Sequence, residues 1–203
     1  MSPRWLLVHI DDALGAAFAE SFADLDDVDV VSGDICHVDC DAIVSPANSF
    51  GFMDGGLDLA LSERFGWGLQ GEVQEMIAAR PMGELLVGEA ISVPTGDSAV
   101  PWLVVAPTMR VPMRLRQSIN AFLAMKAAMI EAISLARRSS VKTVAVSGLG
   151  TGVGGMPVRV SSAQMRTAFN EVALGQIAYP RDFAEAQKRH VSLNPSEIDI
   201  WND

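Results

Sequence analysis

The stretch Ser147-Gly148-Leu149-Gly150-Thr151-Gly152-Val153-Gly154-Gly155-Met156-Pro157 decides the fold of this chain. It has five glycines within eight positions, which permit tight turns and let the backbone approach a ligand with no Cβ in the way. It follows the apolar residues Thr143–Val146, which predict a buried strand. Backbone N–H groups of such a loop can converge on an oxyanion, so the stretch predicts a phosphate loop, with a plain turn as the alternative.

The same stretch argues against two common nucleotide-binding folds. It lacks the lysine of a Walker A loop, which argues against a P-loop NTPase. It also follows the last clear strand of the chain and not the first, which argues against a Rossmann dinucleotide fold.

Outward from this loop, apolar runs alternate with helical patterns, as is typical of βαβ units. The sequence therefore predicts an α/β protein, a three-layer α/β/α sandwich with a mostly parallel, mixed central sheet. Strands are expected at Trp5–Ile10, Val28–Val31, Ala42–Val44, Ala90–Val93, Leu103–Ala106 and Thr143–Ser147. Helices are expected at Ala13–Ala23, Leu57–Phe65, Leu69–Ala79, Arg116–Arg137, Ser161–Leu174 and Arg181–Arg189. No linker or repeat divides the chain, which predicts a single domain over residues 1–192 and a polar tail at 193–203.

Composition narrows the possible partners. The chain has 203 residues, of which 49% are hydrophobic, and this is enough to build a full core. The formal net charge of −10 argues against non-specific binding of nucleic acid but allows a small anion held by backbone amides. No apolar run is long enough to span a membrane, so we expect no membrane partner and, by default, a cytoplasmic location.

The cysteines do not indicate a disulfide scaffold or a metal centre. Cys36 and Cys40 are the only two in the chain. With His37 and Asp39 they form a run that looks like a metal site, but a structural zinc site usually has two separated pairs of ligands. We therefore expect no metal and no cofactor.

Two further segments follow predicted strands, where ligands bind in open α/β sheets. Gly33-Asp34-Ile35 follows Val28–Val31, and the second segment runs from Ser45 through Asn48 into Asp54-Gly55-Gly56-Leu57-Asp58. Asn48 comes just after the apolar Ala42–Val44, where its carboxamide can donate to and accept from ribose hydroxyls. Gly55-Gly56 precede a predicted helix, whose N-terminal amides form a second anion site. The alternative is that these residues only make turns. Two glycine loops on neighbouring strands favour a diphosphate held between them.

The four segments together resemble the macrodomain family, in the manner of a divergent bacterial- or phage-type member. In chain order they are Gly33-Asp34-Ile35, Ala42-Ile43-Val44-Ser45-Pro46-Ala47-Asn48, Gly55-Gly56-Leu57-Asp58 and Gly150-Thr151-Gly152-Val153-Gly154-Gly155-Met156-Pro157. The resemblance implies an ADP-ribose site at the carboxyl edge of the sheet. It implies ADP-ribose or an ADP-ribosylated protein as partner, and it leaves the oligomeric state unknown.

The resemblance also implies a role for each residue. Asp34 and the Ile35 backbone would face the adenine, and Asn48 would hold the distal ribose. Gly55, Gly56 and Leu57 would form the first phosphate loop. The second would comprise the residues Thr151, Gly152, Val153 and Gly154, with Ser147 and Gly150 counted among the ligand-binding residues of the same stretch.

Asp58 decides between a binding module and an enzyme. In the hydrolase branch of the family, an Asp at this place acts on the distal ribose, so the resemblance implies Asp58 and Asn48 as catalytic residues. A carboxylate there can orient or deprotonate a water, but an Asp in the first turn of a helix also serves as a cap. Three functions stay open: a non-catalytic ADP-ribose reader, a hydrolase, and a structural protein retaining the fold. The hydrolase would process protein ADP-ribose esters, O-acetyl-ADP-ribose or ADP-ribose 1″-phosphate (Appr-1-p).

The sequence also departs from the family pattern. Ser45 and Pro46 replace residues of the usual asparagine motif, Asp54 replaces a glycine, and Gly154 stands where many members carry an aromatic. We expect the usual last strand to be missing near residues 177–181. Candidates for the aromatic that stacks on adenine are Tyr179 and Phe183, and candidates for the lost ring are Phe50, Phe52 and Met53. Arg110 and Arg114 are candidates to meet a phosphate or another subunit, with solvated surface charge as the alternative.

Overall fold

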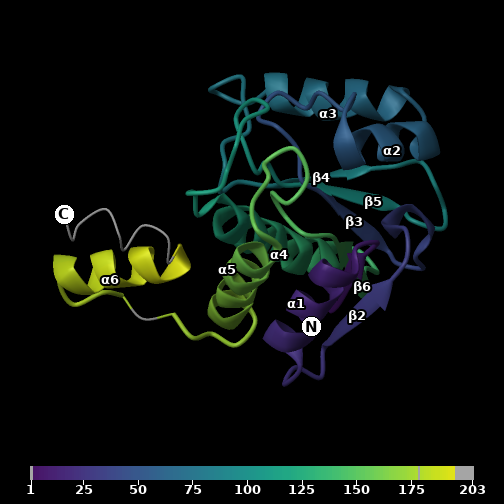
Figure 1. Ribbon diagram of the computed structural model, residues 1–203. Helices are drawn as coiled ribbons and strands as arrows, with labels where there is room; N and C mark the ends of the chain where they lie inside the picture. The colour runs from purple at the N-terminus through teal and green to yellow at the C-terminus, as the bar shows by residue number, and fades with distance from the viewer. Residues whose placement is uncertain (1, 178, 195–203) are drawn as a thin grey trace.

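Short apolar segments form the six strands of one sheet in the computed structural model, which describes residues 2–177 and 179–194 (Figure 1). The strands are β1 Arg4–His9, β2 Val28–Ser32, β3 Ala42–Ser45, β4 Ile91–Pro94, β5 Trp102–Val105 and β6 Thr143–Val146. The helices are α1 Asp12–Phe22, η1 Ile35–His37, α2 Gly56–Phe65, α3 Gly68–Ala78, α4 Asn120–Arg138, α5 Val158–Val172 and α6 Phe183–Leu193. The strand order is β2-β1-β6-β3-β5-β4, with β4 antiparallel to β5 and the other pairs parallel.

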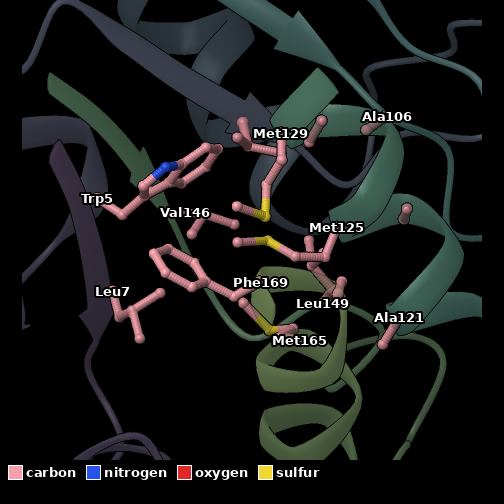
Figure 2. Close-up of a cluster of buried hydrophobic side chains, with 14 of the residues drawn as sticks. Trp5, Leu7, Ala106, Ala121, Met125, Met129, Val146, Leu149, Met165 and Phe169 are labelled. Carbon is pink, nitrogen blue, oxygen red and sulfur yellow. The ribbon is translucent and has the colours of Figure 1, made fainter. Parts of the chain in front are cut away.

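Alternating side chains of the strands fill two separate cores. In β1, Trp5 and Leu7 pack on one face with side chains of α1, α4 and α5, and Figure 2 shows both residues beside methionines of α4 and α5. Leu6 and Val8 point to the other face, which α2 and α3 cover. Because both faces of the central strands are buried, β3, β5 and β6 are apolar along almost their whole length, whereas the edge strand β2 is only partly buried. The predicted three-layer α/β/α sandwich is confirmed.

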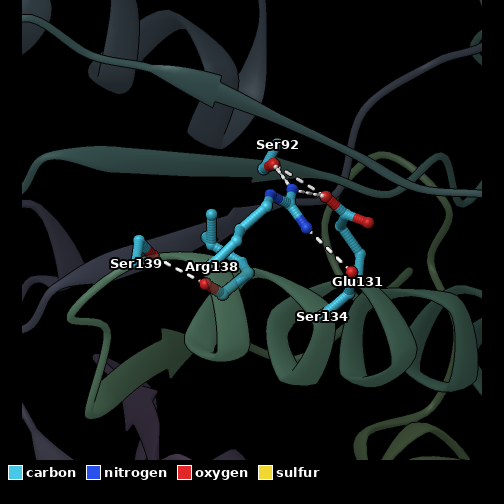
Figure 3. Close-up of polar contacts among 6 residues, drawn as sticks. Ser92, Glu131, Ser134, Arg138 and Ser139 are labelled. Carbon is cyan, nitrogen blue, oxygen red and sulfur yellow. Dashed lines mark hydrogen bonds and ion pairs between the residues drawn. The ribbon is translucent and has the colours of Figure 1, made fainter.

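A polar cluster fastens the edge strand β4 to α4 (Figure 3). Arg138 Nη2 donates to Ser92 Oγ and to Glu131 Oε1, both over 2.6 Å. Ser92 Oγ in turn donates to Glu131 over 2.7 Å. The cluster therefore holds the single antiparallel strand of the described sheet against the helix that follows β5.

The predicted strands lie within one residue of the observed ones at every end, but three helices start elsewhere. Helix α5 begins at Val158 and not at Ser161, and α6 begins at Phe183 and not at Arg181. The helix predicted from Arg116 begins at Asn120. Ser118 Oγ accepts a hydrogen bond from the Asn120 amide over 3.4 Å, and Asn120 Nδ2 donates to Thr108 O over 2.8 Å. These contacts keep residues 116–119 in the loop at the carboxyl edge of the sheet.

In the C-terminal part, the bounds of the last helix and of the tail differ from the predicted ones. Among the described residues no strand follows α5, as the sequence led us to expect. Leu193, predicted to begin the tail, is the last residue of α6, and most of the predicted tail, residues 195–203, lies outside the described residues. Helix α6 lies to one side of the sandwich in Figure 1 and has no buried residue. None of the described helices is long and apolar enough to cross a membrane.

Candidate functional site

Parallel pairing brings the predicted ligand segments to one edge of the sheet. Ser45, the last residue of β3, pairs with Val105, and Val146, the last residue of β6, pairs with Leu7 of β1. The segments that follow these strands therefore leave the sheet side by side. They include the glycine loops around Gly56 and Gly152, which we call the first and second glycine loops (residues 54–58 and 147–157).

The first glycine loop presents unused amides at the start of α2. Gly55 is the N-cap residue, and no side chain caps the helix. The amides of Gly56, Leu57 and Asp58 donate to no acceptor in the described part of the chain. Gly56 has φ of +58°, a conformation that glycine adopts without strain. Exposed amides at a helix N-terminus favour an anion.

The second glycine loop is closed by its own backbone. Met156 N donates to Gly150 O, and Gly155 N donates to Gly152 O, both over 3.0 Å. The amides between them, those of Gly152, Val153 and Gly154, find no acceptor within residues 2–177 and 179–194. The loop is therefore a turn with a row of available donors at its tip.

The two glycine loops face each other. A Cβ placed on Gly56 would lie 4.0 Å from Val153 Cγ2, which is ordinary van der Waals contact. Val153 itself is 54% exposed. Two loops with unused amides thus lie next to each other at the surface, an arrangement that suits two linked phosphates.

Gly154 is buried by its neighbours, which explains the lack of an aromatic residue there. A Cβ on Gly154 would lie 2.5 Å from Gly150 O and 2.9 Å from Leu115 Cδ1. Its carbonyl accepts a hydrogen bond from Leu115 N over 2.8 Å. The segment after β5 therefore occupies the space beside Gly154 that a larger side chain would need.

Asn48 uses most of its carboxamide within its own loop. Its Oδ1 accepts hydrogen bonds from the amides of Phe50 and Phe52, over 3.1 and 3.3 Å, and its Nδ2 donates to Phe52 O over 2.8 Å. One N–H of Asn48 stays available. Ser147, at the end of β6, is half-buried at the start of the second glycine loop.

The residues proposed to stack on adenine or to replace the lost ring differ in how exposed they are. Phe52, which Asn48 holds, is 53% exposed beside the site, whereas Met53 is buried. The guanidinium of Arg110 lies over the ring of Phe50, 4.9 Å from its centroid. Tyr179 and Phe183, by contrast, are 92% and 81% exposed.

Asp34 caps the short helix η1. Its carboxylate accepts from the Cys36 amide over 2.9 Å and contacts His37 Nδ1 at 3.0 Å, and the Cys36 hydrogen bond holds the pKa of Asp34 below its usual value. The side chain of Asp34 is still 55% exposed, while Ile35 is buried. The sequence assigned no role to His9, yet it lies at this end of the sheet, where its carbonyl accepts from Gly33 N over 2.9 Å.

Asp58 points inward and bonds to Ser45. Ser45 Oγ donates to Asp58 Oδ1 over 2.6 Å, and the two side chains are 1% and 7% exposed. Burial raises the pKa of Asp58 to about 6, and the Ser45 hydrogen bond opposes that rise. Ser45 stands where the family commonly has asparagine, and the sequence did not indicate its partnership with Asp58.

The two cysteines are free and buried, and burial raises the pKa of each thiol to about 11. No group of three or more His, Cys, Asp or Glu side chains among the described residues is arranged to hold a metal ion.

The three-layer sandwich with two glycine loops at its carboxyl edge defines the class, an α/β protein with a mostly parallel sheet, and the comparisons identify the family. The model of the Macro domain family matches residues 44–165, so the chain belongs to that family. An uncharacterized protein of Aquifex aeolicus is 34% identical over 139 residues, which cover 68% of this chain and 78% of that protein.

Solved macrodomains share the fold. The macrodomain of Mycobacterium tuberculosis DarG is 26% identical, with a TM-score of 0.54 over 70% of this chain and 88% of that chain. A variant of the Oceanobacillus iheyensis macrodomain, solved with ADPR, is 21% identical, with a TM-score of 0.58 over 79% of this chain and 90% of that chain.

Proposed function

We propose that this macrodomain binds ADP-ribose or an ADP-ribose derivative, with the diphosphate between the two glycine loops. The position of Val153 opposite Gly56 supports this most directly, because it brings two loops with unused amides next to each other. Hydrogen bonds from amides to a charged oxyanion are stronger than those between neutral groups. The diphosphate can therefore be held locally in a chain whose net charge is −10.

With the diphosphate between the loops, the adenine and the distal ribose would lie on opposite sides of it. Asp34 is exposed on the β2 side, where its carboxylate is available to the adenine amino group beside the Ile35 backbone. On the β3 side, the free N–H of Asn48 would donate to the distal ribose, with Phe52 as the exposed ring nearest to it. Ser147 and Gly150 shape the start of the second loop.

We further propose that the site hydrolyses ADP-ribosyl linkages, with Asp58 and Asn48 as its catalytic residues. The pKa of about 6 for Asp58 favours this, because a carboxyl group that titrates near neutral pH is suited to exchange protons with a water. Protein ADP-ribose esters, O-acetyl-ADP-ribose and ADP-ribose 1″-phosphate are the candidate substrates. A reader without chemistry, or a structural protein, is the alternative.

Calorimetric titration with ADP-ribose, with AMP and ADP as controls, tests the binding. We expect micromolar affinity for ADP-ribose and much weaker binding of AMP, because AMP lacks the second phosphate and the distal ribose. No heat and no thermal shift at millimolar ADP-ribose would contradict the proposal. Turnover of the candidate substrates by the wild type and by Asp58→Ala tests the chemistry. If Asp58 is catalytic, the variant should lose turnover and still bind ADP-ribose.

A further inference from the structure

The segment after β5 bridges the two sides of the proposed ADP-ribose site. We call residues 110–116, with the sequence RVPMRLR, the arginine segment. At its start, Arg110 O accepts from Ser49 N over 3.1 Å, beside Asn48. Near its end, Leu115 N donates to Gly154 O over 2.8 Å, and Arg114 Nη1 donates to Val153 O over 3.1 Å. The segment therefore lies beside both the Asn48 side and the second glycine loop of the proposed site.

Two arginines of the arginine segment have no neutralising carboxylate among the residues that the structure describes. Arg114 and Arg116 line an open hollow of about 420 Å³ together with Gln117 and Ser118. Arg110 pairs with Glu84, but Arg114 and Arg116 have no carboxylate partner in the described part of the chain. The sequence has no Asp or Glu between Asp97 and Glu131, although its net charge is −10. The segregation of charge is therefore strong and local.

Exposed apolar side chains lie between these arginines. Val111 is 46% exposed and Met113 is 50% exposed. Arginine and methionine are enriched at protein–protein interfaces. The arginine segment has no aromatic ring, which is the usual platform on which the bases of a single-stranded nucleic acid stack.

We propose that the arginine segment is a docking surface for an acidic peptide that flanks an ADP-ribosylated residue. The inference rests on the proposed function, since the ADP-ribosyl group anchors the peptide beside Arg114. Carboxylates of the peptide would pair with Arg114 and Arg116 in the hollow, and its apolar side chains would pack on Val111 and Met113. Protein ADP-ribosylated within acidic sequence is thus the substrate class.

Fluorescence anisotropy with two ADP-ribosylated peptides of equal length tests the proposal. One peptide has Asp and Glu around the modified residue, and the other has Asn and Gln. Both carry a linkage that resists hydrolysis. We expect the acidic peptide to bind about fivefold more tightly at low ionic strength, with the preference fading as salt screens the charges.

Arg116→Glu is the diagnostic variant because Arg116 lines the hollow, whereas Arg114 is the arginine that lies against the second glycine loop. It should abolish the preference for the acidic peptide and leave the affinity for free ADP-ribose unchanged within twofold. Arg137→Glu makes the same charge change on an exposed arginine at the other end of α4 and should keep the preference.

Several outcomes would overturn the docking surface. Equal affinity for the two peptides, with free ADP-ribose still bound, would refute it and leave the proposed function intact. If a single-stranded oligonucleotide binds in a way that depends on Arg116, and neither peptide is preferred, the partner is a nucleic acid and not an acidic peptide. If the acidic peptide is preferred only by a variant that ends at Asn194, the occupant of the surface is the chain's own acidic end, which contains Glu197, Asp199 and Asp203. Failure to bind ADP-ribose at all would remove the proposed function and the docking surface together.

Discussion

Ser45 and Asp58 form a buried pair, in which Ser45 Oγ donates to Asp58 Oδ1 over 2.6 Å. The pair joins the last residue of β3 to the first turn of α2, on which the first glycine loop depends. A buried carboxyl group is costly when ionised, so this contact links the stability of the domain to the protonation of one side chain.

Asp58→Asn should stabilise the protein increasingly as the pH rises. The pKa of Asp58 is raised in the folded state to about 6, from 3.8, so the folded protein binds the proton more tightly and wild-type stability falls as the pH rises from about 4 to about 6. Asparagine has no charge to bury. Its stability advantage should be larger at pH 7.5 than at pH 5 by roughly 1 kcal/mol. Urea unfolding at the two pH values measures this, and a constant difference would contradict it.

Ser45→Ala should raise the pKa of Asp58 further, because it removes the hydrogen bond that favours the ionised form. Carboxyl-carbon NMR titration of Asp58 in both proteins gives the pKa directly and requires no turnover. Ser161→Ala, which removes another buried hydroxyl bonded to Leu149 O, serves as the control and should leave the titration of Asp58 unchanged. A lower or equal pKa in Ser45→Ala would show that the hydroxyl does not act on the carboxylate.

Gly154→Ala should destabilise the domain by about 2 kcal/mol, since its Cβ would lie 2.5 Å from Gly150 O. Gly152→Ala is the matched control in the same loop, where a Cβ would meet nothing within 4 Å, and it should change stability by less than about 0.5 kcal/mol. Thermal and chemical unfolding compare the two. Equal effects would mean that the second glycine loop adapts freely.

Val153→Asp should weaken ADP-ribose binding by about tenfold or more without unfolding the protein. The new carboxylate would lie opposite Gly56, where we place the diphosphate, and like charges in an interface are strongly unfavourable. Ile130→Asp on α4 is matched in exposure, 55% against 54%, and should bind normally. Unchanged affinity in Val153→Asp would move the diphosphate away from these loops.

Most of the architecture could be predicted, because both faces of the sheet are buried and the strands are therefore apolar runs such as Ala42–Val44. The start of α4 could not. Residues 116–119 carry no strong helix breaker, and their loop conformation depends on contacts with distant residues, such as those of Ser118 O with Gln164 and of Asn120 with Thr108. Helix ends set by tertiary contacts leave little trace in local sequence.

The candidate site could be predicted as a set of segments but not as a set of contacts. The glycines of both loops marked their place, since few other residues permit such turns. The pairing of Ser45 with Asp58 joins residues that no periodicity relates. The packing of Leu115 against Gly154 spans 39 positions, and only the folded chain brings these residues together.

The position of β6 between β1 and β3 has a consequence for folding during synthesis on the ribosome. Until residues 143–146 emerge, the strands already made can form only two unconnected half-sheets, β2-β1 and β3-β5-β4. Non-local parallel pairing of this kind is slow, and unpaired strand edges attract other chains. A nascent chain whose synthesis stops before β6 should therefore bind chaperones. A chain whose synthesis stops after α5 already contains all six strands of the described sheet.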